Sequence, residues 1–81
     1  MEVVLSDRTR VDCVTATHAV EVDFGAHWAE SIGQSLYYAL HTGLRGGVVL
    51  IVRPDEYRYW LRLNTAIDAY RLPLDTWMVA R

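Results

Sequence analysis

An unbroken run of aliphatic side chains, Val48 to Val52, constrains the fold more than any other part of the sequence. A strand that lacks polar alternation is typical of a sheet position covered on both faces. Gly46-Gly47 precedes the run and Arg53-Pro54-Asp55 ends it, and these are residues that favour turns. We therefore predict a central, buried strand over residues 48–52.

Segments with helical periodicity flank this strand on both sides. Residues 26–42 form the clearest helix, and Gly43 provides its C-terminal stop. The apolar side chains on one face of this helix are Trp28, Ile32, Leu36, Ala39 and Leu40. A second helix is predicted over residues 56–70, with Asp55 as its cap and Leu63 and Ile67 facing inward. This helix–strand–helix order predicts an α/β fold.

Three strand-like segments precede the first helix, and one follows the second. They are Glu2–Leu5, Thr9–Val14, His18–Phe24 and, at an expected sheet edge, Asp75–Ala80. In the third segment Glu21 and Asp23 share one face, whereas Val20, Val22 and Phe24 share the other. The sequence thus predicts a single α/β domain over residues 1–81, with a mixed sheet and the element order βββαβαβ.

Composition limits the classes of protein to consider. A chain of 81 residues has a thin core, so its three Trp and five Tyr lead us to expect a homodimer. The single Cys13 forms no internal disulfide, which is typical of a reducing compartment. The chain shows no secretory pattern, and its longest apolar run is too short to span a bilayer. We expect a cytoplasmic protein, in a bacterium or a phage-infected host, that does not bind membranes.

The net charge of −2 argues against a nonspecific nucleic-acid binder. All eight basic residues are arginines, however, and the chain contains no lysine. Arginine is the better side chain for binding phosphate oxygens, and a bound divalent ion changes the local charge. The charge balance therefore leaves DNA open as a partner.

Three carboxylates align if the strands pair as simple hairpins. A turn centred on Asp7 places Glu2 opposite Asp12, and a turn between Ala16 and Thr17 places Asp12 opposite Glu21. Directly opposed side chains have Cβ atoms about 4.5–5.5 Å apart, and like charges at that spacing are destabilising. A hard divalent cation would compensate the repulsion. A plain solvated strand face is the alternative interpretation.

The first predicted helix carries a polar stripe opposite its apolar face. Its members lie three or four residues apart and are His27, Glu30, Gln34, Tyr38 and His41. Taken alone, the stripe indicates a solvent-facing helix surface. Combined with the strands, it places Gln34 and Tyr38 beside the acidic row.

A strand Asp, a following strand Glu and a helical Gln-x-x-x-Tyr element occur in this order in the chain. They are Asp12, Glu21-Val22-Asp23 and Gln34-Ser35-Leu36-Tyr37-Tyr38. This arrangement resembles the PD-(D/E)XK nuclease superfamily, in particular its RecB-like and Holliday-junction-resolvase-like branches and their small bacterial and phage members. The resemblance covers roughly residues 2–52. It implies a minimal restriction-endonuclease-like core and a metal-dependent DNA endonuclease, possible substrates being branched or recombination DNA.

The resemblance also implies roles for single residues. Asp12 and Glu21, assisted by Glu2, would hold Mg²⁺, for which Mn²⁺ would substitute. Gln34 and Tyr38 would orient the attacking water or contact the DNA backbone. The family's motif lysine is replaced by Asp23, and His27 at the start of the helix would take its place. The alternative is that His27 is a surface residue and the chain a weak or inactive nuclease-fold module for DNA binding or assembly.

Other candidate sites carry weaker patterns. Cys13 and the three histidines lack the close ligand pairs of a zinc site, and we expect Cys13 in the core. Arg53, Arg58 and Arg62 form either a phosphate-binding patch or a solvated helix face. Trp77 is expected in the core.

Overall fold

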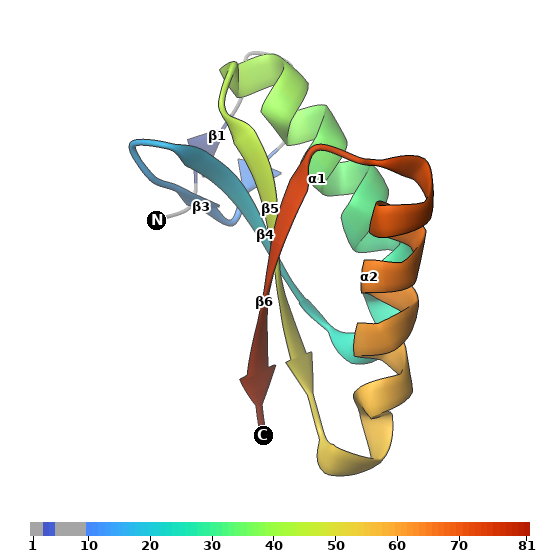
Figure 1. Ribbon diagram of the computed structural model, residues 1–81. Helices are drawn as coiled ribbons and strands as arrows, with labels where there is room; N and C mark the ends of the chain where they lie inside the picture. Colours follow the sequence, from blue (N-terminus) through green and yellow to red (C-terminus); the bar gives the residue numbers. More distant parts are fainter. Residues whose placement is uncertain (1–2, 5–9) are drawn as a thin grey trace.

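The structure is a computed structural model that describes the backbone of residues 3–4 and 10 and the whole of residues 11–81. A mixed sheet of four strands has the order β3–β4–β5–β6 (Figure 1). Its strands are β3 (Cys13–Val14), β4 (His18–Phe24), β5 (Arg45–Val52) and β6 (Leu74–Ala80). β3 runs antiparallel to β4, whereas β4, β5 and β6 are parallel to one another. Separately, β1 (Val3–Val4) pairs antiparallel with β2 (Arg10–Val11).

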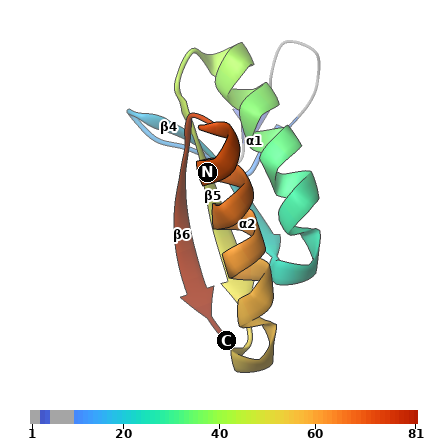
Figure 2. The same ribbon diagram turned by 45° about the vertical axis from the view of Figure 1, so that its right-hand side comes forward.

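Two helices make the crossovers between the parallel strands. A 3-10 turn, η1 (Gly25–His27), leads into α1 (Trp28–Thr42), and a second turn, η2 (Pro54–Glu56), leads into α2 (Tyr57–Tyr70). Both helices lie on the same side of the sheet (Figures 1 and 2), as two right-handed crossovers in the same direction require. α1 ends at Gly43, whose φ of 69° lies in the left-handed region that glycine adopts freely.

The mixed sheet and both helices confirm the predicted α/β class, but the strand order differs in one place. The predicted strand Thr9–Val14 is interrupted at Asp12, so the described residues form four strands before α1. β5 is also longer than predicted, because Gly46 and Gly47 belong to the strand. Glu56 occupies the N-cap position of α2, where Asp55 was predicted, and its side chain accepts a hydrogen bond from the backbone N–H of Arg53 before η2.

The core lies between the sheet and the two helices. Val48, Leu50 and Val52 point from β5 toward the helices and contact Leu63 and Ile67 of α2. Leu63 and Ile67 are buried, as predicted. The prediction that β5 is covered on both faces is wrong, because Val49 and Ile51 are only half-buried on the helix-free side.

The predicted apolar face of α1 is confirmed at Trp28, Ile32 and Leu36, which lie half-buried against the core, but the most deeply buried residues of the helix are others. Ser31, Ser35 and Tyr38 are buried, while Leu40 is 77% exposed. The serine hydroxyls bond to helix carbonyls one turn back, so small polar residues can lie against the sheet without unpaired groups. At Gly46 a Cβ atom would lie 3.0 Å from the backbone oxygen of Ser35. The helix therefore packs closest where both surfaces carry small residues.

None of the described helices is long and apolar enough to cross a membrane. Trp77, predicted in the core, is 43% exposed on β6. Cys13 is half-buried on β3.

Candidate active site

The hairpin between β3 and β4 has the predicted register. Cys13 pairs with Val20 and Val14 with Ala19, so Asp12 stands opposite Glu21. Asp12 lies at the break between β2 and β3, where its Oδ2 accepts a 2.9 Å hydrogen bond from the backbone N–H of Val22. The side chain thereby replaces a backbone partner of β4, and this contact fixes the carboxylate against the strand.

Glu21 occupies the middle of β4 and is only 6% exposed. Its strand register places it beside Val48 of β5, so the side chain lies on the sheet face that α1 covers. A carboxylate is costly to bury unless partners satisfy it. Glu21 therefore marks a place where polar neighbours must gather.

Two side chains of α1 provide such partners. Tyr38 is buried and makes a side-chain hydrogen bond with Glu21. With the Gln34 amide nitrogen facing Glu21, it donates to the two carboxylate oxygens at 3.1 and 3.3 Å. Gln34 and Tyr38 are four residues apart and so lie on one helix face. The structure thus brings four predicted site residues together: Asp12, Glu21, Gln34 and Tyr38.

The electrostatics of this cluster are those of crowded carboxylates. Burial raises the pKa of Glu21 to about 8, helped by its hydrogen bond with Asp12 and by the charges of Asp12 and Asp23. The Tyr38 hydrogen bond opposes this rise in pKa. Burial raises the pKa of Asp23 as well, while the charge of His27 opposes the rise. At neutral pH, Glu21 therefore holds a proton unless a cation replaces it.

His27 ends the turn η1 directly before α1. Its side chain is 54% exposed, and its Nδ1 lies 3.2 Å from Oε2 of Glu30. It also acts on Asp23 electrostatically. His27 therefore lies within electrostatic reach of Asp23, and Glu30 is a ring partner that the sequence analysis did not assign to it.

Glu2, the third predicted metal ligand, lies outside the described residues. The β1–β2 pairing nevertheless has the predicted register, with Val3 opposite Val11 and Val4 opposite Arg10. Among the side chains described from residue 11 on, no group of three or more His, Cys, Asp or Glu residues is arranged to hold a metal. Asp12 and Glu21 form a pair of oxygen donors of the kind that Mg²⁺ binds.

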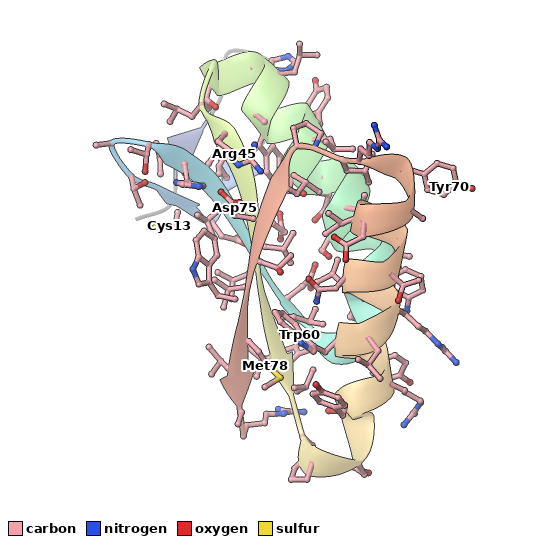
Figure 3. All side chains as sticks on the ribbon, viewed as in Figure 1. Cys13, Arg45, Trp60, Tyr70, Asp75 and Met78 are labelled. Atoms are coloured by element: carbon pink, nitrogen blue, oxygen red, sulfur yellow. The ribbon has the colours of Figure 1, made fainter. Side chains whose placement is uncertain are left out.

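A second polar cluster lies at the N-terminal end of β4, and the sequence analysis missed it. Asp75 of β6 accepts from His18 Nε2 at 2.7 Å and from Arg45 Nε and Nη2 at 2.7 and 3.1 Å; Figure 3 shows Arg45 beside Asp75. These hydrogen bonds, that of Arg45 first, lower the pKa of Asp75 to about 2. The sequence alone does not reveal this cluster, because His18 and Asp75 are 57 residues apart and meet only through the parallel pairing of β4, β5 and β6.

The three arginines of the predicted phosphate-binding patch lie on or just before α2. Arg58 and Arg62 lie over the ring of Tyr59, with guanidinium carbons 4.4 and 5.8 Å from its centroid. Both arginines are exposed on α2, as is Arg53 before it. This arrangement is compatible with either predicted interpretation of the patch.

Comparison of the chain with family models, curated proteins and solved structures gives no match.

Proposed function

We propose that this chain is a metal-dependent DNA endonuclease of the PD-(D/E)XK type. The observation that carries the proposal is the contact of Asp12 with a buried Glu21 whose pKa is about 8. Nothing in the packing of an α/β core requires a carboxylate at that position. Buried carboxylates with strongly shifted pKa values are typical of functional sites.

The two carboxylates fit a hard divalent cation. Each presents oxygen donors, and Glu21 would exchange its proton for the metal. Under the proposal Asp12 and Glu21 hold Mg²⁺ or Mn²⁺, with Glu2 as a third ligand. When bound, the ion would polarise the scissile phosphate and lower the pKa of a water molecule.

Gln34 and Tyr38 act on Glu21 in this proposal. Both hold its carboxylate from the α1 side. Side chains that fix a metal ligand in this way control its orientation and basicity. Gln34 is exposed and can also reach a water molecule or a DNA phosphate.

His27 takes the part of the missing lysine in this proposal. It lies at the start of α1, within electrostatic reach of Asp23, and is exposed to solvent. An imidazole can transfer a proton to or from water, which is the contribution needed beside the metal. Branched or recombination DNA is the proposed substrate, and the protein would act in the cytoplasm of a bacterium or a phage-infected host.

A nuclease-fold module without catalysis is the second candidate. The observation that favours it is that Asp23 stands where the family has its lysine, while the His27 ring bonds to Glu30. Such a module would bind DNA or assemble with other proteins and leave the phosphodiester bond intact.

A cleavage assay separates the two candidates. Single-stranded, duplex and four-way-junction DNA are incubated with the protein in Mg²⁺, Mn²⁺ or EDTA. We expect cleavage with either metal and none with EDTA, and Glu21→Gln should abolish it. Asp68→Asn, which changes an exposed carboxylate on α2, is the matched control. DNA binding without cleavage in any metal would favour the module.

Calorimetry tests the metal site without DNA. Titration with Mn²⁺ should show binding to the wild type and to Asp68→Asn, and much weaker binding to Asp12→Asn. Absence of Mn²⁺ binding at millimolar concentration would overturn the metal site and, with it, the endonuclease proposal.

A further inference from the structure

Strand β6 ends the sheet, and its outer edge carries exposed apolar side chains. Trp77, Met78 and Val79 are 43, 43 and 46% exposed. Figure 2 shows β6 on the outside of the sheet, and no other described strand pairs with it beyond β5. An edge strand presents unpaired N–H and C=O groups to any chain that can extend the sheet.

The sequence of β6 does not protect this edge. Residues 76–80 contain no charge and no proline, which are the usual means of blocking edge pairing. Trp77 and Val79 lie on the helix-free face and Met78 lies on the helix face, so a chain added along β6 would cover apolar groups on both sides. Figure 3 shows Met78 projecting from this strand.

The hydrogen bond that follows β6 shows which of its backbone N–H and C=O groups point toward β5 and which point to the free edge. The N–H of Arg81 donates to the carbonyl of Val52 at 2.9 Å. In a parallel pair alternate residues bond to the neighbour, so Val79 and Trp77 also direct their backbone groups toward β5. Thr76, Met78 and Ala80 therefore direct theirs outward, to the free edge.

We propose that two copies of this chain form a dimer by pairing antiparallel along β6, with the two-fold axis at Met78. Met78 then faces the partner's Met78 in a hydrogen-bonded pair, and Thr76 faces the partner's Ala80 in another. On the helix-free face Trp77 lies against the partner's Val79, an aromatic and β-branched pair that stabilises sheets. The two sheets become one sheet that continues through both copies.

Charge sets this register. With the axis at Met78, Asp75 stands opposite the partner's Arg81, and the same contact occurs twice. Among the described side chains, Asp75 Oδ2 accepts from His18 and Arg45, whereas Oδ1 accepts from Arg45 alone, so Oδ1 can accept again. Arg81 is exposed and lies over Phe24 on the same face, with its guanidinium carbon 4.6 Å from the ring centroid. An axis at Trp77 would place Asp75 opposite Val79 and leave both charges without this contact.

The inference does not depend on the nuclease proposal, because no β6 residue belongs to the Asp12–Glu21 site. Light scattering on the full chain should give a dimer mass at tens of micromolar and a falling mass on dilution. Met78→Lys places two like charges at the axis and should weaken dimerisation by at least tenfold. Leu40→Lys, which changes an even more exposed apolar residue on α1, should leave the dimer intact. Circular dichroism shows whether each variant folds.

Cross-linking tests the register. In a Cys13→Ser background, Met78→Cys should form an intermolecular disulfide on mild oxidation, since opposed Cα atoms in such a pair are about 5.5 Å apart. Trp77→Cys should not form one. A monomer at 100 µM concentration, or a dimer that Leu40→Lys weakens and Met78→Lys does not, would overturn the proposal. Cross-linking of Trp77→Cys in place of Met78→Cys would overturn the register at Met78.

Discussion

The carboxylate of Asp12 accepts a hydrogen bond of 2.9 Å from the backbone N–H of Val22, a residue of the neighbouring strand. This contact explains why the predicted strand Thr9–Val14 is interrupted at Asp12, since the side chain takes over a bond that the backbone would make. It also holds Asp12 against Glu21, on which Gln34 and Tyr38 converge from α1. The local irregularity of the sheet and the crowding of the carboxylates therefore have one cause.

The raised pKa of Glu21 predicts a loss of stability with rising pH. A carboxyl group whose pKa is higher in the folded than in the unfolded state favours folding at low pH, and this advantage disappears as the pH rises. For Glu21 the window runs from about 4.5 to about 8. In the absence of metal, the unfolding free energy should fall across this window, and Glu21→Gln should remove most of the decline.

Urea unfolding at intervals between pH 5 and pH 9 measures this effect. The difference between wild type and Glu21→Gln isolates the contribution of Glu21 from that of every group the two proteins share. Parallel pH profiles of the two proteins would show that Glu21 carries no shifted pKa.

Metal should stabilise the folded protein, because a ligand that binds only the folded state raises its stability. At a concentration 100 times the Kd, the gain is about 2.7 kcal/mol, or roughly 10–20 °C in Tm for a domain of this size. Thermal melts with and without Mn²⁺ should show this shift for the wild type and for Asp68→Asn. Asp12→Asn should lose most of it, and an equal shift in Asp12→Asn would place the bound metal elsewhere.

The Asp75 cluster predicts a separate sensitivity to acid. Its pKa of about 2 lies below the ordinary value of 3.8, so its contribution to stability is present above pH 4 and is lost as the pH falls toward 2. Asp75→Asn should lower the Tm at pH 7 and have little effect at pH 2. The exposure of this carboxylate to solvent reduces the size of the effect. A Tm difference that is equal at both pH values would mean that the ion pair contributes nothing.

Two glycines should respond to alanine in opposite directions. A Cβ at Gly33 of α1 meets nothing within 4 Å, so Gly33→Ala should stabilise the helix by about 0.5–1 kcal/mol. At Gly46 a Cβ would lie 2.5 Å from Leu74 Cδ2 and 3.0 Å from the Ser35 backbone oxygen. Gly46→Ala should therefore destabilise by about 1–3 kcal/mol. Chemical denaturation of both variants measures the pair, and a neutral Gly46→Ala would indicate looser packing of α1 on β5.

The sequence pattern predicted the elements and the β3–β4 register well, because strand alternation and turn residues are local signals. It predicted less well which side chains of each element are buried. The buried face of α1 depends on how closely Ser31 and Ser35 can approach a glycine-bearing strand. Hydrophobic periodicity carries no information about such close packing of small polar residues. The exposure of Trp77 follows from the position of β6 at the sheet edge, and that position depends on strand order rather than on the residues of β6.

The candidate site was predictable in part for the same reason. Asp12 and Glu21 are brought together by a short hairpin, and α1 follows directly, so Gln34 and Tyr38 are placed by local connections. The cluster of His18, Arg45 and Asp75 needs the parallel pairing of β5 with β6 across a whole helix. The partnership of His27 with Glu30 was within reach, since residues three apart on a helical segment are neighbours.

His27 decides whether the chain carries out catalysis without a lysine. If it supplies the missing proton transfer, His27→Ala should lower the rate of DNA cleavage by on the order of 10²-fold. His27→Lys should retain or improve the activity, because it restores the residue type of the family at the start of α1. Glu30→Ala removes the ring partner seen at 3.2 Å and leaves the carboxylate pair intact, so it tests whether that contact holds His27 in place.

Single-turnover cleavage rates with Mg²⁺ at saturating enzyme measure these effects apart from DNA affinity. Glu21→Gln should abolish cleavage in the wild-type and the His27→Lys backgrounds alike, since the lysine cannot act without the metal ligands. Equal rates for wild type and His27→Ala would show that His27 is a surface residue and that water is activated elsewhere. If neither wild type nor His27→Lys cuts DNA that both bind, then a lysine at this position does not restore cleavage. The chain is then a nuclease-fold binding module, and the Asp12–Glu21 pair serves a role other than phosphodiester hydrolysis.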